Sequence, residues 1–174
     1  MEKMAFDYIV IGGGSAGCVL AGRLSEDPKI SVCLVEAGGD GNGWTVNVPC
    51  AAVMSIPTKL NNWAFETVPQ KGLNGRKGYQ PRGKGLGGSS AINAMVYIRG
   101  NAQDYDHWAA LGNEGWSYQD VLPYFIKSEN NDRIQNQYHG NAGPLSVSDL
   151  RSDNPLQARY LAAARELNYP ILDD

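Results

Sequence analysis

A glycine pattern near the N-terminus constrains the fold of this chain more than any other feature. Residues 12–17 read GGGSAG, which fits G-x-G-x-x-G, and they stand between a short apolar run at 6–11 and a run with helical spacing at 15–27. A second apolar run follows at 30–35. A strand, a helix and a strand within about 30 residues form a right-handed βαβ unit. The sequence therefore predicts an α/β fold with a Rossmann-like βαβ unit at residues 6–36.

The glycines of this pattern have distinct expected roles. Gly12 allows the tight turn, Gly14 lets the backbone reach a pyrophosphate, and Gly17 lets the helix lie close to the strand. Ser15 opens the helix, whose free N–H groups and positive dipole end favour a pyrophosphate. Glu36 follows Gly17 by nineteen residues, where a carboxylate can accept hydrogen bonds from a ribose diol. The pattern predicts an adenine dinucleotide and leaves FAD and NAD open.

A second glycine cluster lies at residues 81–93, which read PRGKGLGGSSAIN. Its glycines let the backbone approach a large ligand. Two basic side chains and two hydroxyls accompany them at the start of an expected helix over residues 91–98, namely Arg82, Lys84, Ser89 and Ser90. We interpret the cluster as a second cradle for a phosphate or cofactor, and a plain glycine-rich loop is the alternative.

Composition narrows the function classes. The chain has 21 glycines in 174 residues, against a usual content of about 7%. Its net charge of −3 gives no basic stripe for a nucleic-acid backbone, and its 43% hydrophobic content excludes a disordered tail. Cys18, Cys33 and Cys50 are an odd number and are expected to be reduced thiols. Without a Cys/His cluster of ligand spacing, no metal site is predicted.

The first apolar run is too short for a signal peptide or a membrane span, because it covers only residues 6–11. We therefore expect a cytoplasmic chain, and peripheral contact with a membrane stays open.

The other segments have local patterns of their own. A short helix is expected at 51–56, a strand at 63–68, a helix at 104–111 and an edge strand at 143–147. Ser117 and Asp120 form a capping-box pattern before a helix that Pro123 should kink or restart. Asn154 followed by Pro155 predicts another helix start.

The stretch from Gly83 to Asp106 resembles the first signature of the glucose–methanol–choline (GMC) oxidoreductases. The matching positions are Gly83, Lys84, Leu86, Gly87, Gly88, Ser89, Ser90, Ile92, Asn93, Tyr97, Gly100 and Asp106. The resemblance extends over residues 7–17, 36–38, 62–65, 115–117, 121–125 and 139–145. It spans nearly the whole chain, and within the family it is strongest to the bacterial choline dehydrogenase-like, FAD-dependent alcohol dehydrogenases.

The resemblance implies FAD as the cofactor. It implies a pyrophosphate site at the first glycine pattern, a ribose site at Glu36, an adenine end near Trp63, and an isoalloxazine ring beside residues 93–96. The cofactor-binding residues that we expect are Gly12, Gly14, Ser15, Gly17, Glu36, Ala37, Trp63, Arg82, Gly83, Gly88, Ser89, Asn93, Ala94, Met95 and Val96. Some members attach flavin covalently through a His in this loop. Ile92 stands at the aligned position, so noncovalent FAD is expected.

The activity that the resemblance implies is oxidation of a small-molecule alcohol by hydride transfer to flavin N5, with oxygen or a quinone as electron acceptor. The family's catalytic His lies on a late segment, and neither His107 nor His139 matches it, so no catalytic residue is expected in this chain. The chain is thus expected to be a truncated N-terminal part, completed by the remainder of the enzyme or by a complementary chain.

The expected domain plan follows the same resemblance. Residues 1–145 form the N-terminal portion of an FAD-binding domain, and residues 146–174 begin an α+β substrate-binding domain. The first portion comprises the βαβ unit at 6–36, a flavin-contacting loop at 81–98, and a lid or helical region at 37–80 and 99–140.

Other functions share part of these patterns. A non-catalytic flavin-binding fragment is one alternative. A variant reaction on the same scaffold, such as that of a hydroxynitrile lyase or a fatty-acid photodecarboxylase, is another. An NAD-dependent dehydrogenase would account for residues 12–36 but not for residues 83–106.

Overall fold

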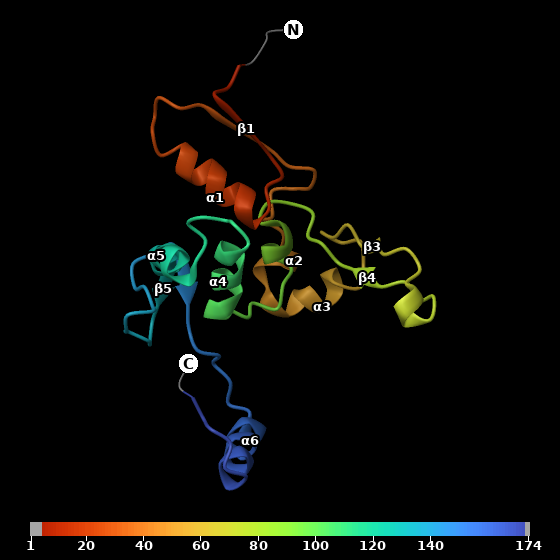
Figure 1. Cartoon of the computed structure of the whole chain (residues 1–174). Helices are drawn as coiled ribbons and strands as arrows, with labels where there is room; N and C mark the ends of the chain where they lie inside the picture. Colours follow the sequence, from red (N-terminus) through yellow and green to blue (C-terminus); the bar gives the residue numbers. More distant parts are fainter. Residues whose placement is uncertain (1–4, 173–174) are drawn as a thin grey trace. The chain divides into compact units, whose positions relative to one another are not determined.

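The computed structural model describes residues 5–172 and shows a mixed α/β chain (Figure 1). The outermost ends of the expected 1–145 and 146–174 regions therefore lie outside the described residues. The chain divides into two compact units between Val96 and Tyr97, which we call the N-terminal and C-terminal units. Across residues 5–172 there is no helix that is both long and apolar enough to span a bilayer.

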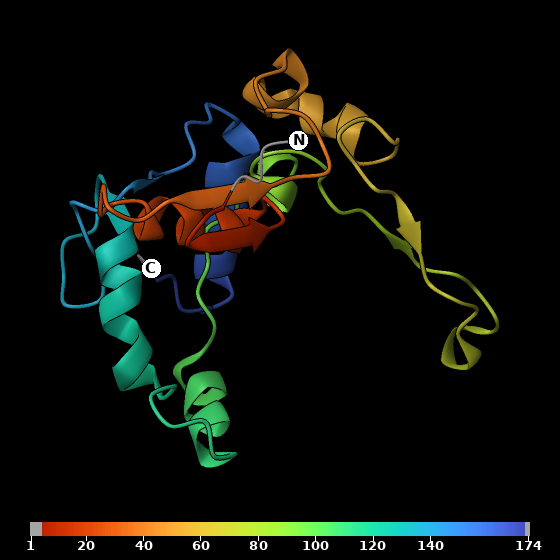
Figure 2. The same ribbon diagram turned by 90° about the horizontal axis from the view of Figure 1, so that it is seen from above.

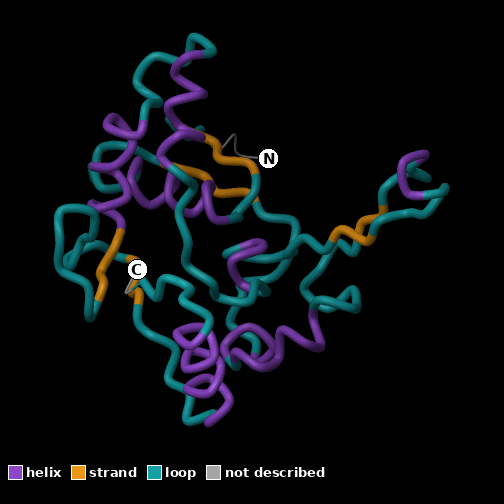
Figure 3. The backbone as a smooth tube through the Cα atoms, turned by 60° about the horizontal axis from the view of Figure 1, so that its bottom comes forward, coloured by secondary structure: helices purple, strands orange, loops and turns teal. Residues whose placement is uncertain are grey.

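The N-terminal unit begins with the expected βαβ unit. It consists of β1 (Tyr8–Ile11), α1 (Ser15–Leu24) and β2 (Val32–Val35). The strands run parallel and side by side, with Tyr8 opposite Val32 and Ile11 opposite Val35 (Figure 3). Helix α1 ends at Leu24, earlier than the expected residue 27, because Ser25 leaves the helical conformation and the next N–H, that of Glu26, donates to the Arg23 carbonyl three residues back. The prediction of a Rossmann-like α/β fold is confirmed.

A long excursion follows β2 and returns to it. It contains α2 (Trp44–Asn47), the 3-10 turn η1 (Pro49–Ala51), α3 (Ala52–Ser55), β3 (Phe65–Glu66), η2 (Lys71–Leu73) and β4 (Tyr79–Gln80). Strands β3 and β4 pair antiparallel in a narrow ribbon with η2 at its end (Figure 2). The short helix expected at 51–56 is present as η1 and α3. The strand expected at 63–68 is only two residues long, because Ala64 has a left-handed φ of 51° that interrupts it.

The second glycine cluster carries η3 (Gly88–Ala91), and the helix expected over residues 91–98 is wrong. The backbone after Ile92 is irregular instead. The Asn93 side chain accepts a hydrogen bond from the Met95 N–H at 2.9 Å, and Met95 adopts a left-handed φ of 58°. This local bond competes with helix formation and turns the chain away from it.

The C-terminal unit contains α4 (Ala102–Ala110), α5 (Tyr118–Ser128), β5 (Glu129–Asn131), β6 (Leu145–Val147) and α6 (Pro155–Glu166). The expected capping box of Ser117 and Asp120 is formed, and Asn154 caps α6 with Pro155 at its first position. Strand β6 covers the last three residues of the segment expected at 143–147 and pairs parallel with β5.

The expected restart of the helix at Pro123 is wrong, because α5 is one continuous helix from Tyr118 to Ser128 with Pro123 inside it. Proline removes one backbone N–H bond, here to the Gln119 carbonyl. The capping box before it supports the first turn, and Phe125 after it packs edge-on against Tyr105 of α4, with ring centroids 5.6 Å apart. These contacts on both sides keep the helix continuous.

Apolar side chains of the βαβ unit are widely exposed. Ile11 of β1 is 86% exposed and Val19 of α1 is 62% exposed. Among the described residues, only Ala51 and Ile92 are hydrophobic and buried. Exposed apolar surface of this extent is typical of a face that another polypeptide segment covers.

Candidate functional site

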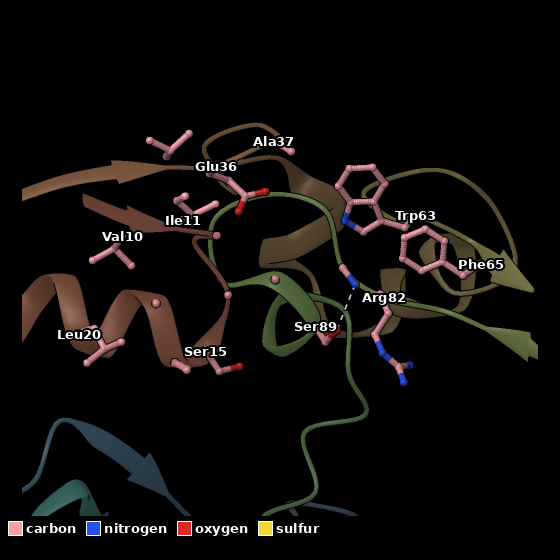
Figure 4. Close-up of a pocket in the computed structure, with 17 residues that line it drawn as sticks. Val10, Ile11, Ser15, Leu20, Glu36, Ala37, Trp63, Phe65, Arg82 and Ser89 are labelled. Carbon is pink, nitrogen blue, oxygen red and sulfur yellow. Dashed lines mark hydrogen bonds between the residues drawn. The ribbon is translucent and has the colours of Figure 1, made fainter. Parts of the chain in front are cut away.

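A cavity of about 880 Å³ lies in the N-terminal unit, beside the carboxyl ends of β1 and β2 and the first turn of α1 (Figure 4). This volume is at the upper end of the range for small-molecule and cofactor sites. The cavity brings together eleven of the fifteen expected cofactor-binding residues, namely Gly12, Gly14, Ser15, Gly17, Glu36, Ala37, Trp63, Arg82, Gly83, Gly88 and Ser89. Six further lining residues were not expected, namely Val10, Ile11, Ala16, Leu20, Val35 and Phe65.

The first glycine pattern has the backbone geometry that its spacing indicates. Gly12 turns the chain with a φ of 96°, and a Cβ on Gly17 would overlap the Gly12 carbonyl. Gly14 caps α1 without a side-chain hydrogen bond, and a Cβ there would meet nothing within 4 Å. The first-turn N–H groups of a helix have no intrahelical partner. The open space at Gly14 therefore leaves these donors available to an anion.

The two glycine clusters touch one another. The Gly87 N–H donates to the Gly13 carbonyl at 2.8 Å, and the hydroxyls of Ser15 and Ser90 are hydrogen-bonded. A Cβ on Gly88 would lie 2.7 Å from the Cα of Gly14, so residue 88 has no room for a side chain on the side that faces Gly14. The clusters form one cradle that is almost free of side chains.

Glu36 lies at the centre of this cradle. Its carboxylate accepts hydrogen bonds from the N–H groups of Gly13 at 2.7 Å, Gly38 at 2.9 Å and Gly85 at 3.0 Å. The bonds from Gly38 and Gly13 are the main reason that the pKa of Glu36 is below its ordinary value. A carboxylate in this setting is ionised at neutral pH. The spacing that indicated a ribose partner carried no signal for these three backbone partners.

Aromatic rings form one wall of the cavity. Trp63 and Phe65 stack with ring centroids 5.6 Å apart and planes 8° from parallel, and Figure 4 shows them near Arg82. The Lys84 ammonium lies 4.4 Å from the Trp63 ring centroid, a cation–π contact. The sequence prediction missed Phe65 as a wall residue. Its position two residues after Trp63, on one face of an expected strand, is the signal that could have found it.

Asn62 anchors this wall. The side chain is buried, and its Oδ1 accepts from the N–H groups of Ala64 at 3.0 Å and Arg82 at 2.9 Å. Its amide nitrogen donates toward the carbonyls of the α3 end, including that of Ile56 at 3.0 Å. One amide thus fixes the backbone on both sides of Trp63 and at Arg82, a role that the sequence prediction did not assign.

Four expected residues lie outside the cavity. Asn93, Ala94, Met95 and Val96 form an exposed segment at the end of the N-terminal unit. Ile92, at the position where some family members carry the flavin-linking His, is 5% exposed.

The C-terminal unit contains a buried charged cluster around Glu129, which is fully buried. Its carboxylate lies 2.5 Å from Arg99 Nη2 and 2.8 Å from His139 Nδ1, and it accepts from the Asn131 amide and the Gly140 N–H. Burial alone would raise the pKa of Glu129, but bonds from His139, Asn131 and Gly140 and the Arg99 charge outweigh it and hold the pKa below its usual range. His107 lies exposed on α4.

Metal ligands are not gathered anywhere in residues 5–172, where no three His, Cys, Asp or Glu side chains form a group that could hold an ion. The cysteines Cys18, Cys33 and Cys50 are free.

Comparison with known proteins decides the family. The family described as GMC oxidoreductase matches residues 6–174 of the chain. The chain belongs to the GMC oxidoreductases. The family predicted from residues 83–106 is therefore confirmed. The match is not to the NAD-dependent dehydrogenases that were the alternative for residues 12–36.

Individual relatives and solved structures are similar over nearly the whole chain. The "Oxygen-dependent choline dehydrogenase" of Yersinia pseudotuberculosis is 50% identical over 98% of this chain and 31% of its own length. The crystal structure of pyridoxine 4-oxidase from Mesorbium loti matches with a TM-score of 0.88 and 34% identity, over 97% of this chain and 33% of that one. An FAD-dependent oxidoreductase from Chaetomium thermophilum matches with a TM-score of 0.84 and 35% identity, over 98% and 31%. The chain thus spans about a third of the length of these three proteins.

Proposed function

We propose that this chain binds FAD noncovalently in the cavity of the N-terminal unit, and that it serves an enzyme that oxidises a small alcohol. The observation that carries the proposal is the closure of two glycine clusters on each other at the N-terminus of α1, with Gly14 facing open space. A pyrophosphate needs many N–H donors and no intruding side chain, and this cradle offers both. The FAD-dependent protein from Chaetomium thermophilum is similar over the same residues.

The residues of the cavity suit the parts of FAD in a definite order. In this proposal the pyrophosphate lies at Gly12, Gly14, Ser15 and Gly17, and the adenosine ribose at Glu36 and Ala37. The ionised Glu36 carboxylate would repel a 2′-phosphate. The stacked rings of Trp63 and Phe65 offer an apolar face near the adenine.

The second cluster extends the path toward the flavin. Arg82, Gly83, Gly88 and Ser89 line the same cavity, and the Ser89 hydroxyl accepts from the Gly83 N–H at 3.1 Å. The exposed segment of Asn93, Ala94, Met95 and Val96 would approach the isoalloxazine ring. Backbone N–H groups of this segment other than that of Met95, which donates to the Asn93 side chain, would stabilise negative charge on reduced flavin.

We place the catalytic base outside this chain. His139 is bound to the buried Glu129 carboxylate, and His107 is an exposed residue of α4. FAD, when bound, supplies a hydride acceptor at N5. The rest of a longer protein, or a complementary chain, would supply the base and cover the exposed apolar surface of α1 and β1. Residues 1–145 would then belong to the FAD-binding domain and residues 146–174 to the start of the substrate-binding domain, in a cytoplasmic enzyme.

Flavin binding and reduction test this function. We expect the chain to retain FAD but not NAD on gel filtration. Its visible flavin band should stay unbleached when choline, the alcohol named for the Yersinia relative, is added without oxygen. In a longer protein that contains this chain, choline or another small alcohol should bleach the flavin band. If neither this chain nor the longer protein retains FAD, the proposal is refuted. If choline bleaches the flavin band of this chain by itself, the placement of the catalytic base outside the chain is refuted.

The same experiment separates the alternative functions. A longer protein that holds FAD, never bleaches with alcohols, and instead cleaves a cyanohydrin or decarboxylates a fatty acid under light would perform a variant reaction on this scaffold. If the longer protein binds flavin but carries out none of these reactions, the non-catalytic flavin-binding function is the one supported.

The noncovalent attachment of FAD has its own test. Ile92 has no nucleophilic atom, so acid precipitation of the flavin-loaded protein should leave the yellow colour in the supernatant. Flavin added after precipitation of the unliganded protein controls for trapping in the pellet. Colour that stays on the washed, denatured protein would contradict this expectation.

A further inference from the structure

The bonding of Glu36 indicates more than a ribose ligand. Oε2 accepts from Gly13 of the first glycine pattern, and Oε1 accepts from both Gly38 and Gly85. These N–H groups belong to three segments that are far apart in the sequence, since Glu36 and Gly85 are separated by 49 positions. A carboxylate has about four lone-pair sites, two on each oxygen. Three are therefore taken by backbone N–H groups, which leaves at most one, on Oε2, because the Ala37 N–H also helps to lower the pKa of this carboxylate.

The residues held by Glu36 adjoin the walls of the cavity. Gly13 directly precedes Gly14, and Gly85 lies three positions before Gly88. Gly14 and Gly88 face each other across the cradle, since a Cβ on Gly88 would lie 2.7 Å from the Cα of Gly14. A bond from Gly87 N–H to the Gly13 carbonyl also joins the two clusters, but it is a neutral bond. Bonds to an ionised carboxylate are roughly twice as strong as neutral ones.

We propose that the Glu36 carboxylate is a positioning group that fastens the two glycine clusters together before the dinucleotide enters, and that it offers the ribose only its one remaining acceptor site. The second half of this proposal rests on the proposed function, whereas the first concerns the unliganded protein alone. Preorganisation of this kind improves affinity because the loops need not be ordered on binding.

Glu36→Gln separates this role from that of a simple ribose ligand. A glutamine can still exchange hydrogen bonds with a ribose diol, because its amide both donates and accepts. It cannot accept hydrogen bonds both from Gly13 and from the Gly38–Gly85 pair. Only one of its two terminal atoms is an acceptor oxygen, and the other is an NH₂ donor. A ribose-only role therefore predicts no change in the unliganded protein, and the positioning role predicts a change there.

The experiment is amide hydrogen exchange, followed residue by residue by NMR on the full chain without nucleotide. In Glu36→Gln we expect the amides of Gly13, Gly38 and Gly85 to exchange about tenfold faster or more. The Gly12 amide, which donates to the Val35 carbonyl at 2.8 Å, reports on the βαβ unit and should keep its protection. Glu66→Gln is the matched control, because Glu66 is exposed on β3 and bonds none of the three glycines.

Each other outcome overturns the proposal. If the exchange rates of the three glycine amides do not change in Glu36→Gln, Glu36 has no positioning role and can serve only as a ribose ligand. Unprotected glycine amides in the parent chain would mean that the clusters are not fastened before binding. Equal acceleration at Gly12 would mean that Glu36 supports the whole βαβ unit.

A FAD titration of the same proteins keeps the proposed function separate. We expect the dissociation constant of FAD to rise about tenfold in Glu36→Gln and to stay unchanged in Glu66→Gln. If the parent chain does not bind FAD at all, the proposed function fails, while the exchange result still decides the positioning role.

Discussion

Gly17→Ala is expected to weaken FAD binding about 100-fold or more and to lower the free energy of unfolding by about 3 kcal/mol. A methyl group at residue 17 would overlap the carbonyl oxygen of Gly12, and it would also approach Val10. Backbone cannot move aside as a flexible side chain can, so α1 would have to shift away from β1. This shift would displace the first-turn N–H groups that we assign to the pyrophosphate. Thermal unfolding and a flavin fluorescence titration measure the two effects.

The control lies in the same helix. Gly22 is also within α1, but a Cβ there would meet nothing within 4 Å. Gly22→Ala should therefore stabilise the chain by about 1 kcal/mol, the difference in helix propensity, and leave FAD binding unchanged. Wild-type affinity in Gly17→Ala would show that the close approach of α1 to the glycine turn is not needed for binding.

Glu129→Gln is expected to destabilise the chain by about 3–5 kcal/mol at neutral pH. Glu129 is the common partner of Arg99 and His139, and it is itself fully buried. A neutral amide would leave the buried Arg99 charge without its counter-charge. Urea unfolding at pH 7, followed by circular dichroism, measures the loss. Glu114→Gln, at an exposed position before α5, should change stability by less than about 0.5 kcal/mol.

The pH dependence of this loss has a definite sign. The folded state lowers the pKa of Glu129, so the carboxylate stabilises the fold above its unfolded pKa of about 4.3. That contribution disappears as the pH falls through the lower, folded pKa. The stability difference between the wild type and Glu129→Gln should therefore be largest near neutral pH and shrink in acid. A difference that grows as the pH falls below about 5 would contradict the assignment.

Local patterns were sufficient for much of the fold. The βαβ unit was predicted because Gly12, Gly14 and Gly17 mark the turn and helix start within a few residues of each other. The capping box of Ser117 and Asp120 is equally local and was also predicted. Helix existence and helix starts follow from neighbours along the chain, which a sequence displays directly.

Two expectations about helices were wrong because specific side-chain contacts outweighed the general helix tendency of the residues. Residues 91–98 are apolar enough for a helix, yet one Asn93 side chain bonds the Met95 N–H and turns the backbone left-handed. Pro123 breaks helices in general, yet here a strong cap and an aromatic contact outweigh one missing bond.

Parts of the candidate site could not be read from sequence because their partners are remote. Asn62 bonds the Arg82 N–H twenty positions away, and Glu36 bonds the Gly85 N–H. The pattern around Glu36 indicates an acid after a strand but not which backbone groups will surround it. Such contacts become visible only when the excursion after β2 has returned to the cradle.

That return has a consequence for synthesis of the protein on the ribosome. The contacts that close the cradle join residues 49 to 75 positions apart, from Glu36 with Gly85 to Ser15 with Ser90. Closing so long a loop costs chain entropy that short-range helices do not incur. A nascent chain that has not yet exposed Ser90 contains the residues of α1 and β2 but lacks the contacts that close the cradle. The flavin site that we propose can therefore form only after both glycine clusters have left the exit tunnel.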